Sequence, residues 1–587
     1  MPAFHLDLTA CHQHLVRVRL FHTPSRACLR LALPAWTPGS YLIRDYVRQL
    51  EALTVTQAGR CLQPRRTGTS SWQLELPSLE PLEISYAVLA SELTVRTCHL
   101  DGDHGFLALA AVALELEGER WSPHRLRLQL PPGWQAFVPL PEVDASGGAE
   151  GGAEGDAEGG WLARDLDQLL DTPIEVGPHR AHTFSVAGVP HRWVSWGPDL
   201  QGGDPVETDT LWLTDLERVC LACCRLMGVE RPAAEHYLFV LHLTDSGYGG
   251  LEHDLSTVLQ FGRRTLARPE GRRKLLQLAA HEYLHQWNVR RLRPAELTPY
   301  RYDQAVVVPT LWFAEGVTSY VDQLLPHSAG CSTETEVLED LGSDLSRYLL
   351  SPGRRVQSLR SSSEEAWVKL YRPDAYAPNS QISYYLKGAV LALVLDLHLR
   401  RVGACLPQVL RELWASHGAA GRGYQEADLI AAFARHATDL AERLPDWLTS
   451  CDDPPLHTVL ADVGLRLEPQ LAPSQELGCR LELGAAGLTL QRVVRDGPAE
   501  RAGLAVGDEW LALDGVRLRN VDEVLDLLRP ELPLTAHELL FCRDGRVRST
   551  TLLPEAPAVE RWTLALDPAT AEATASQRRR WLTLEAP

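Results

Sequence analysis

Two histidines four residues apart, with a glutamate directly after the first, are the strongest chemical signal in this sequence. Residues 272–293 read RRKLLQLAAHEYLHQWNVRRLR and contain no glycine or proline, so we expect a helix there. On a helix, His281 and His285 share a face and can direct imidazole nitrogens at one zinc ion. Glu282 is turned to the side of that ion, where it can take a proton from water.

A third ligand is needed, because catalytic zinc sites usually have three protein ligands and one open position. Glu315 lies in the apolar, helix-like segment LWFAEGVTSY, residues 311–320. A buried carboxylate needs a partner, and a metal ion is a natural one. We therefore predict one Zn²⁺ per chain, held by His281, His285 and Glu315, with Glu282 as the general base. The alternative is two surface histidines on an ordinary helix and an unrelated glutamate.

These segments resemble the glycyl aminopeptidase family of zinc peptidases, part of the thermolysin-like group with two His and one Glu as ligands. HEYLHQWNVRRLRP and LWFAEGVTSY carry the resemblance in the catalytic part. PAWTPGSYLIRDYVRQLEAL, residues 34–53, resembles the family's N-terminal β domain. GYGGLEHDLS, residues 247–256, resembles its substrate-binding strand. The resemblance implies a zinc aminopeptidase that releases small N-terminal residues such as Gly or Ala from peptides with a free N-terminus.

The resemblance also implies roles for individual residues. Glu252 matches the residue that binds the substrate's free α-amine, and Gly249 and Gly250 precede it on the substrate-binding strand. An ammonium anchored near the metal fixes the scissile bond one residue into the peptide. Tyr385 matches a tyrosine whose hydroxyl donates to the developing oxyanion, with Tyr384 as the other possible register. Two core aromatics that begin a helix are the structural alternative for this pair.

The partners that orient the zinc histidines stay open at this stage. Zinc-bound histidines usually hydrogen-bond to a carboxylate or carbonyl through the other ring nitrogen. Related enzymes often have Asp four residues after the ligand Glu, but this chain has Ser319 there. Asp322 and Asn288 are the remaining candidates.

The elements that must position these residues indicate a multidomain α+β protein. It has an N-terminal antiparallel β domain, most simply a sandwich, a thermolysin-like catalytic α/β domain plus a helical domain, and a C-terminal PDZ-like domain. The predicted strands of the first domain are short runs punctuated by turn residues, at 14–21, 50–56, 72–76, 82–90 and 125–130. The predicted boundaries are 1–180 for the β domain, 181–345 and 346–462 for the catalytic and helical domains, 465–555 for the PDZ-like domain and 556–587 for the tail.

Three further segments have distinct patterns. Residues 144–160, DASGGAEGGAEGDAEGG, have no apolar side chain larger than Ala, so we expect a flexible insertion. Residues 487–518 have the strand, turn and short-helix pattern of a PDZ domain, which either captures a peptide C-terminus or packs within the chain. The tail contains two strand-like pieces, at 561–566 and 580–584.

Composition narrows the remaining function classes. The 587 residues have a formal net charge of −19, which argues against a nucleic-acid partner. The sequence contains no run of about 18 apolar residues, so we expect no membrane partner. The N-terminus lacks a secretory pattern, and the 12 cysteines form no repeating framework, so we expect reduced thiols in the cytoplasm. Two other functions remain possible: a zinc endopeptidase, or a PDZ-type peptide-binding scaffold with a vestigial metal site.

Overall fold

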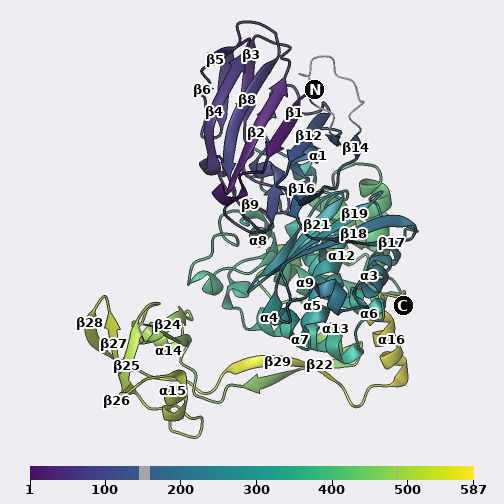
Figure 1. Cartoon of the computed structure of the whole chain (residues 1–587). Coiled ribbons are helices and arrows are strands. Elements are labelled where there is room, and N and C mark those ends of the chain that lie inside the picture. Colours follow the sequence, from purple (N-terminus) through teal and green to yellow (C-terminus); the bar gives the residue numbers. More distant parts are fainter. Residues whose placement is uncertain (144–158, 486) are drawn as a thin grey trace. The chain divides into compact units, whose positions relative to one another are not determined.

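The computed structural model describes residues 1–143, 159–485 and 487–587. Almost all of the insertion predicted at 144–160 therefore lies outside the described residues. The chain divides into two compact units. The first comprises residues 1–306, 328–331 and 410–424, and the second comprises residues 307–327, 332–409 and 425–587. Figure 1 gives the elements of both.

The first unit begins with a β domain built around an eight-stranded sheet, in the order β14-β15-β12-β1-β2-β8-β4-β5. Alternate side chains of β8 are buried, as expected for a strand with one face on a core. All pairs in this sheet are antiparallel except β1 with β12, which run parallel. The predicted strands are therefore confirmed, with one parallel pair among the antiparallel ones. The bounds are β1 Ala3–Asp7, β2 Leu15–His22, β4 Leu50–Gln57, β5 Arg60–Leu62, β8 Leu82–Leu89, β12 His124–Gln129, β14 Glu142–Val143 and β15 Gly160–Ala163.

Two four-stranded sheets complete this domain, in the orders β13-β16-β10-β9 and β11-β3-β7-β6. Strand β10 is buried along its whole length, which fits its continuous apolar sequence. The predicted run at 72–76 corresponds to β7. The bounds are β3 Cys28–Ala32, β6 Arg65–Arg66, β7 Ser71–Glu75, β9 His99–Leu100, β10 Gly105–Ala108, β11 Glu115–Leu116, β13 Gln135–Phe137 and β16 Pro173–Gly177.

The first unit continues with a five-stranded sheet in the order β17-β18-β19-β21-β20. Its middle strand β19 is buried at all but its last residue, because β18 and β21 flank it in parallel. Helix α5 packs against the sheet, and Phe106 and Phe137 of the β domain share a core cluster with Leu238 and Val240 of β19. Strand β20 lies at the edge, antiparallel to β21. The bounds are β17 Ala181–Val186, β18 Val189–Trp196, β19 Tyr237–Thr244, β20 Tyr248–Glu252, β21 Ser256–Gly262, α3 Trp212–Met227 and α5 Gly271–Leu284.

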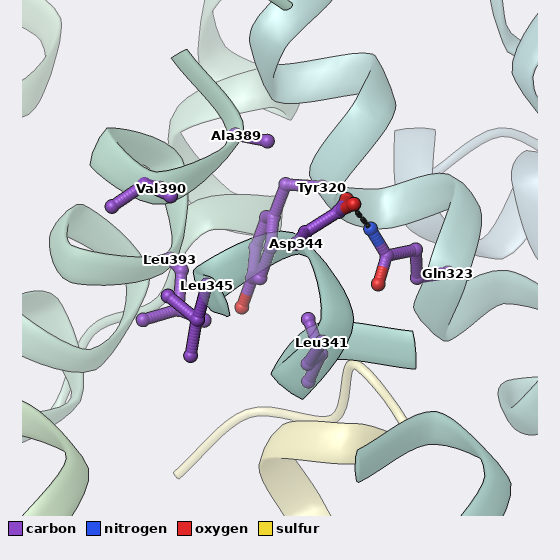
Figure 2. Close-up of a pocket in the computed structure, with 8 residues that line it drawn as sticks. All are labelled: Tyr320, Gln323, Leu341, Asp344, Leu345, Ala389, Val390 and Leu393. Carbon is purple, nitrogen blue, oxygen red and sulfur yellow. Dashed lines mark hydrogen bonds between the residues drawn. The ribbon is translucent and has the colours of Figure 1, made fainter. Parts of the chain in front are cut away.

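The second unit contains a closely packed helical part. Figure 2 shows side chains of α6, α7 and α9 around a cavity of about 10 Å³, which has room for no more than one water molecule. Gln323 donates a hydrogen bond to Asp344 across it, at 2.6 Å. This packing holds two helices together: α6, which follows Glu315, and α9, which begins at Tyr384. The bounds are α6 Val317–Ser328, α7 Glu334–Leu349, α8 Leu359–Glu364, α9 Tyr384–Arg401, α11 Glu426–His436, α12 Leu440–Thr449 and α13 Leu456–Ala461. Helix α10 (Leu406–Leu413) is divided between the two units after residue 409.

The stretch Ala377–Arg401, which includes α9, is long and apolar enough to pass as a membrane-spanning helix. However, 89% of its most apolar window is buried inside the protein. It therefore has the burial of a core helix.

The PDZ domain of the second unit is inserted between two strands of a long ribbon. Strand β22 (Leu465–Leu471) pairs antiparallel with β29 (Val559–Leu566), and Figure 1 shows them side by side. The domain's own core includes Leu490, Trp510 and Phe541. Its bounds are β23 Cys479–Gly484, β24 Gly487–Val493, α14 Pro498–Arg501, β25 Glu509–Leu513, β26 Val516–Arg517, α15 Val521–Leu527, β27 His537–Arg543 and β28 Arg546–Leu552.

One prediction for the tail is confirmed and one is wrong. Strand β29 covers the predicted piece at 561–566, but the piece at 580–584 is mostly the end of helix α16 (Glu572–Leu582). The preceding residues are rich in Ala, Gln and Arg, which favour helix. Trp581 is buried and donates to the hydroxyl of Tyr320 at 2.6 Å, so a tertiary contact holds the last turn.

Candidate active site

The two histidines lie where helix α5 ends. His281 is in its last turn, and His285 caps it. Their ring centroids are 4.7 Å apart with planes at 86°, so they share one face, as the spacing predicted. His285 is buried, and its Nδ1 lies 2.5 Å from the carbonyl oxygen of Asn288. A carbonyl only accepts, so Nδ1 carries the proton and Nε2 keeps its lone pair for a metal ion.

The contact between His285 and Asn288 shows what orients one of the two histidines, which the sequence had left open. Asn288 is a partner of His285 through its backbone rather than through its side chain. A carbonyl that fixes the tautomer of a histidine ligand is a common arrangement around metal ions. The imidazole of His285 therefore fits a zinc ion in both orientation and protonation. Ser319 and Asp322 lie on α6, in the other unit.

Two carboxylates lie beside His285 in the same unit. Glu252 ends the edge strand β20, and Glu282 lies on α5. Ligand atoms of Glu252, Glu282 and His285 all lie within 4.8 Å of one another, and all three residues are buried. Within the part of the chain that the structure describes, Oε1 of Glu252 has no hydrogen-bond partner. Two carboxylates buried this closely are stabilised by a cation that binds between or beside them, and an ammonium group meets that need.

Glycine at position 250 makes the close approach of β20 and α5 possible. A Cβ built on Gly250 would lie 2.3–2.5 Å from atoms of the Glu282 side chain. No side chain therefore fits there without displacing the side chain of Glu282. Arg96 donates to the carbonyl of Gly250 at 3.2 Å and holds the strand in place. Gly249 has φ +154°, in the region that favours glycine.

The N-terminal β domain also reaches Glu252, which the sequence did not predict. Gly39 has φ +80°, and a Cβ on it would lie 2.6 Å from both carboxylate oxygens of Glu252. Gly39 lies in the Pro-Gly-Ser turn of the segment 34–53. The Pro-Gly pair signals a turn, but nothing in the sequence says what that turn touches. Arg96 had no sequence signal.

Glu315 lies in the second unit, in the single π-helical turn η5 (Trp312–Gly316) that leads into α6. It is buried among apolar residues, as predicted. Such turns often occur at functional sites. A Cβ on Gly316 would lie 2.5 Å from Cα of Gly388, so the turn and helix α9 cross backbone to backbone. This crossing fixes the turn that carries Glu315 against the first half of α9.

Tyr384 and Tyr385 begin helix α9. Their rings stack with centroids 4.7 Å apart, and the hydroxyl of Tyr371 lies 3.2 Å from each of their hydroxyls. Tyr384 is completely buried, whereas Tyr385 is partly exposed. Tyr385 is therefore the more accessible hydroxyl of the pair.

Lys387 holds the beginning of this helix. Its ammonium donates to the carbonyls of Arg354 and Gln357, at 3.0 and 3.1 Å. Burial lowers the pKa of Lys387. It therefore anchors the beginning of the helix that carries the two tyrosines.

Comparisons with known proteins agree with this arrangement. The profile of the M61 glycyl aminopeptidase family matches residues 274–391, that of the M61 N-terminal domain matches residues 3–178, and that of a PDZ domain matches residues 490–542. No curated protein matches the chain.

Among solved structures, an aminopeptidase N family protein from Idiomarina loihiensis is 28% identical, with a TM-score of 0.90, and the match covers 99% of this chain and 100% of that chain. A variant of the M1 zinc metallopeptidase from Deinococcus radiodurans is 16% identical, with a TM-score of 0.49 over 78% of this chain and 95% of that one. The fold and the family profiles define a metallo-aminopeptidase. The chain belongs to the M61 glycyl aminopeptidase family, and it carries that family's N-terminal domain and a PDZ domain.

Proposed function

We propose that this protein is a zinc-dependent aminopeptidase that releases small N-terminal residues, Gly or Ala, from peptides with a free N-terminus. The observation that carries the proposal is the pair of buried carboxylates Glu252 and Glu282 beside His285. One carboxylate suits the substrate's ammonium group, and the other suits proton transfer at the adjacent peptide bond. The preference for Gly and Ala rests on the resemblance to the glycyl aminopeptidase family.

The proposed ligands of the zinc ion are His281, His285 and Glu315, the two histidines of HEYLH and the glutamate of LWFAEGVTSY. Two imidazole nitrogens and one carboxylate leave a position open for water or substrate, as catalytic zinc sites require. When bound, the zinc ion supplies a Lewis acid that polarises the scissile carbonyl and lowers the pKa of water.

The chain's own residues account for the remaining steps. Glu252 binds the α-ammonium group and thereby sets which peptide bond is attacked. Glu282 takes a proton from the attacking water and then delivers it to the leaving amine. Tyr385 donates a hydrogen bond to the carbonyl oxygen as negative charge develops on it. The products are a free amino acid and a peptide shortened by one residue.

Blocking the substrate's N-terminus tests this function. We expect Gly- and Ala-initiated peptides with a free amine to be cleaved one residue at a time, and their N-acetylated forms to resist cleavage. An acetylated amine carries no positive charge for Glu252. Mass spectrometry of the products over time is the measurement. Internal cleavage of acetylated peptides would instead show an endopeptidase with the same metal centre.

A further inference from the structure

A cavity of about 500 Å³ lies in the second unit, apart from the residues used so far. Its wall comes from the helical part, between residues 347 and 386, and from Arg492 of the PDZ strand β24. That volume is in the range of pockets that bind small ligands or peptide ends. We call it the Arg492 cavity.

Among the described residues, Arg492 is the basic residue of this cavity's wall that has no carboxylate within 4 Å; the wall also contains one carboxylate, Asp374. The other basic residues of the wall are paired: Arg347 with Asp344 at 3.0 Å and Lys369 with Glu365 at 2.6 Å. Among the described residues, no carboxylate pairs with Arg492, and its buried Nε has no hydrogen-bond partner.

The residue beside Arg492 in the sheet is a second arginine, Arg480. In the register of β23 and β24, Arg480 lies directly opposite Arg492. Like charges in this position are unfavourable. Burial, and then the repulsion of Arg480, lower the pKa of Arg492. Arg492 lines the cavity with Arg480 beside it on the sheet, so an anion bound to Arg492 would offset their repulsion.

Hydrogen bonds hold the wall of the cavity, which includes Ser383, the residue directly before Tyr384. Oε1 of Gln357 accepts from the backbone N–H of Ile382 at 2.9 Å. Asn379 donates to the carbonyl of Val493 at 2.7 Å and accepts from the backbone N–H of Arg495 at 3.1 Å. These bonds fix the PDZ strand against the segment just before α9, and they show that the PDZ domain packs within the chain.

We propose that the Arg492 cavity binds the carboxylate of a peptide, with Arg492 as the principal donor. A guanidinium fork matches a carboxylate with two parallel hydrogen bonds. Gln381, Ser383 and Ser351 line the same cavity and offer further polar groups. That the ligand is a peptide rests on the proposed function, because a peptide substrate carries a carboxylate at its other end. The site is separate from the groove that PDZ domains form between a strand and a helix, here β23 and α15.

Calorimetric titration of N-acetyl-tetra-alanine, as the free acid and as the C-terminal amide, tests this proposal on the full chain. We expect the acid to bind wild-type protein roughly tenfold or more tightly than the amide, because the bond involves a charged acceptor. Arg492→Gln should remove that difference. Arg548→Gln, at an exposed and unpaired arginine of β28, is the matched control and should keep it. Arg492→Lys retains the charge and should keep part of it.

Equal binding of acid and amide by wild-type protein would overturn the proposal, and so would an Arg492→Gln variant that still prefers the acid. If the glutamine variant does not fold, the acid-to-amide comparison on wild type and Arg492→Lys still decides. Succinate that binds as tightly as the peptide acid, in an Arg492-dependent way, would refute the peptide assignment in favour of small dicarboxylates. The acetylated probes have no free amine, so the result is independent of whether the aminopeptidase function is correct.

Discussion

Replacing Glu282 with glutamine is expected to lower kcat by about 10²- to 10⁴-fold while zinc binding is retained. Glutamine has nearly the same shape and fits the same contact with Gly250, but it cannot take a proton from water. The loss should therefore fall on the chemical step, and KM should change little. Steady-state kinetics on a Gly-initiated peptide, with zinc content measured on the same sample, is the measurement.

Glu270→Gln is the matched control for this variant. Glu270 is the N-cap of the same helix α5, and its side chain makes no cap hydrogen bond. It should retain wild-type kcat. If Glu282→Gln were as active as wild type with zinc bound, Glu282 would not be the general base. If Glu282→Gln lost zinc, Glu282 would be needed for metal binding, contrary to its assigned role as general base.

Replacing Glu252 with glutamine is expected to lower kcat/KM for free-amine peptides by about 10²-fold or more. The reason is the loss of a buried, charge-assisted contact with the ammonium group, which contributes roughly 2–3 kcal/mol. Glutamine keeps an acceptor oxygen but not the charge. Because Gly39 and the neighbouring Glu282 enclose this carboxylate, water cannot easily substitute for the lost interaction. Kinetics with free-amine peptides of two to five residues measures the effect.

Asp245→Asn removes a carboxylate from the exposed loop just before β20 and serves as the control. It should leave kcat/KM near the wild-type value. Glu252→Gln with unchanged kinetics would mean that the amine is bound elsewhere.

The sequence predicted best how residues within one helix or strand lie relative to one another. Helical periodicity is local, so the shared face of His281 and His285 followed from their spacing alone. The buried position of Glu315 followed from its apolar neighbours. Strand β8 followed from its alternating pattern for the same reason.

Contacts between distant segments, and contacts of the backbone, were not predictable. The carbonyl of Asn288 orients His285, but every residue has a carbonyl, so no residue type marks it. Gly39 lies close to Glu252 although more than 200 residues of sequence separate them. The sequence of a Pro-Gly turn does not show which part of the protein the turn contacts. Helix α16 depends on Trp581 reaching Tyr320, a tertiary contact that overrides the strand-like pattern at the chain's end.

The roles of Glu252 and Tyr385 came from resemblance rather than from physical pattern. A glutamate at a strand edge and a tyrosine at the start of a helix are common on ordinary surfaces. The structure adds the physical content: Glu252 is buried beside Glu282, and Tyr385 is the exposed member of its pair. For Arg492 the sequence offered no signal, because its unpaired state depends on which residues fold around it.

Elemental analysis of carefully purified protein tests the central claim most directly. One zinc ion per chain is expected in the wild type, and substoichiometric zinc in His285→Ala and Glu315→Gln, because each loses one of three protein ligands. Activity should disappear with a chelator and return with added zinc. Purified wild-type protein that contains no stoichiometric transition metal, and takes none up on reconstitution, would contradict this account of the protein.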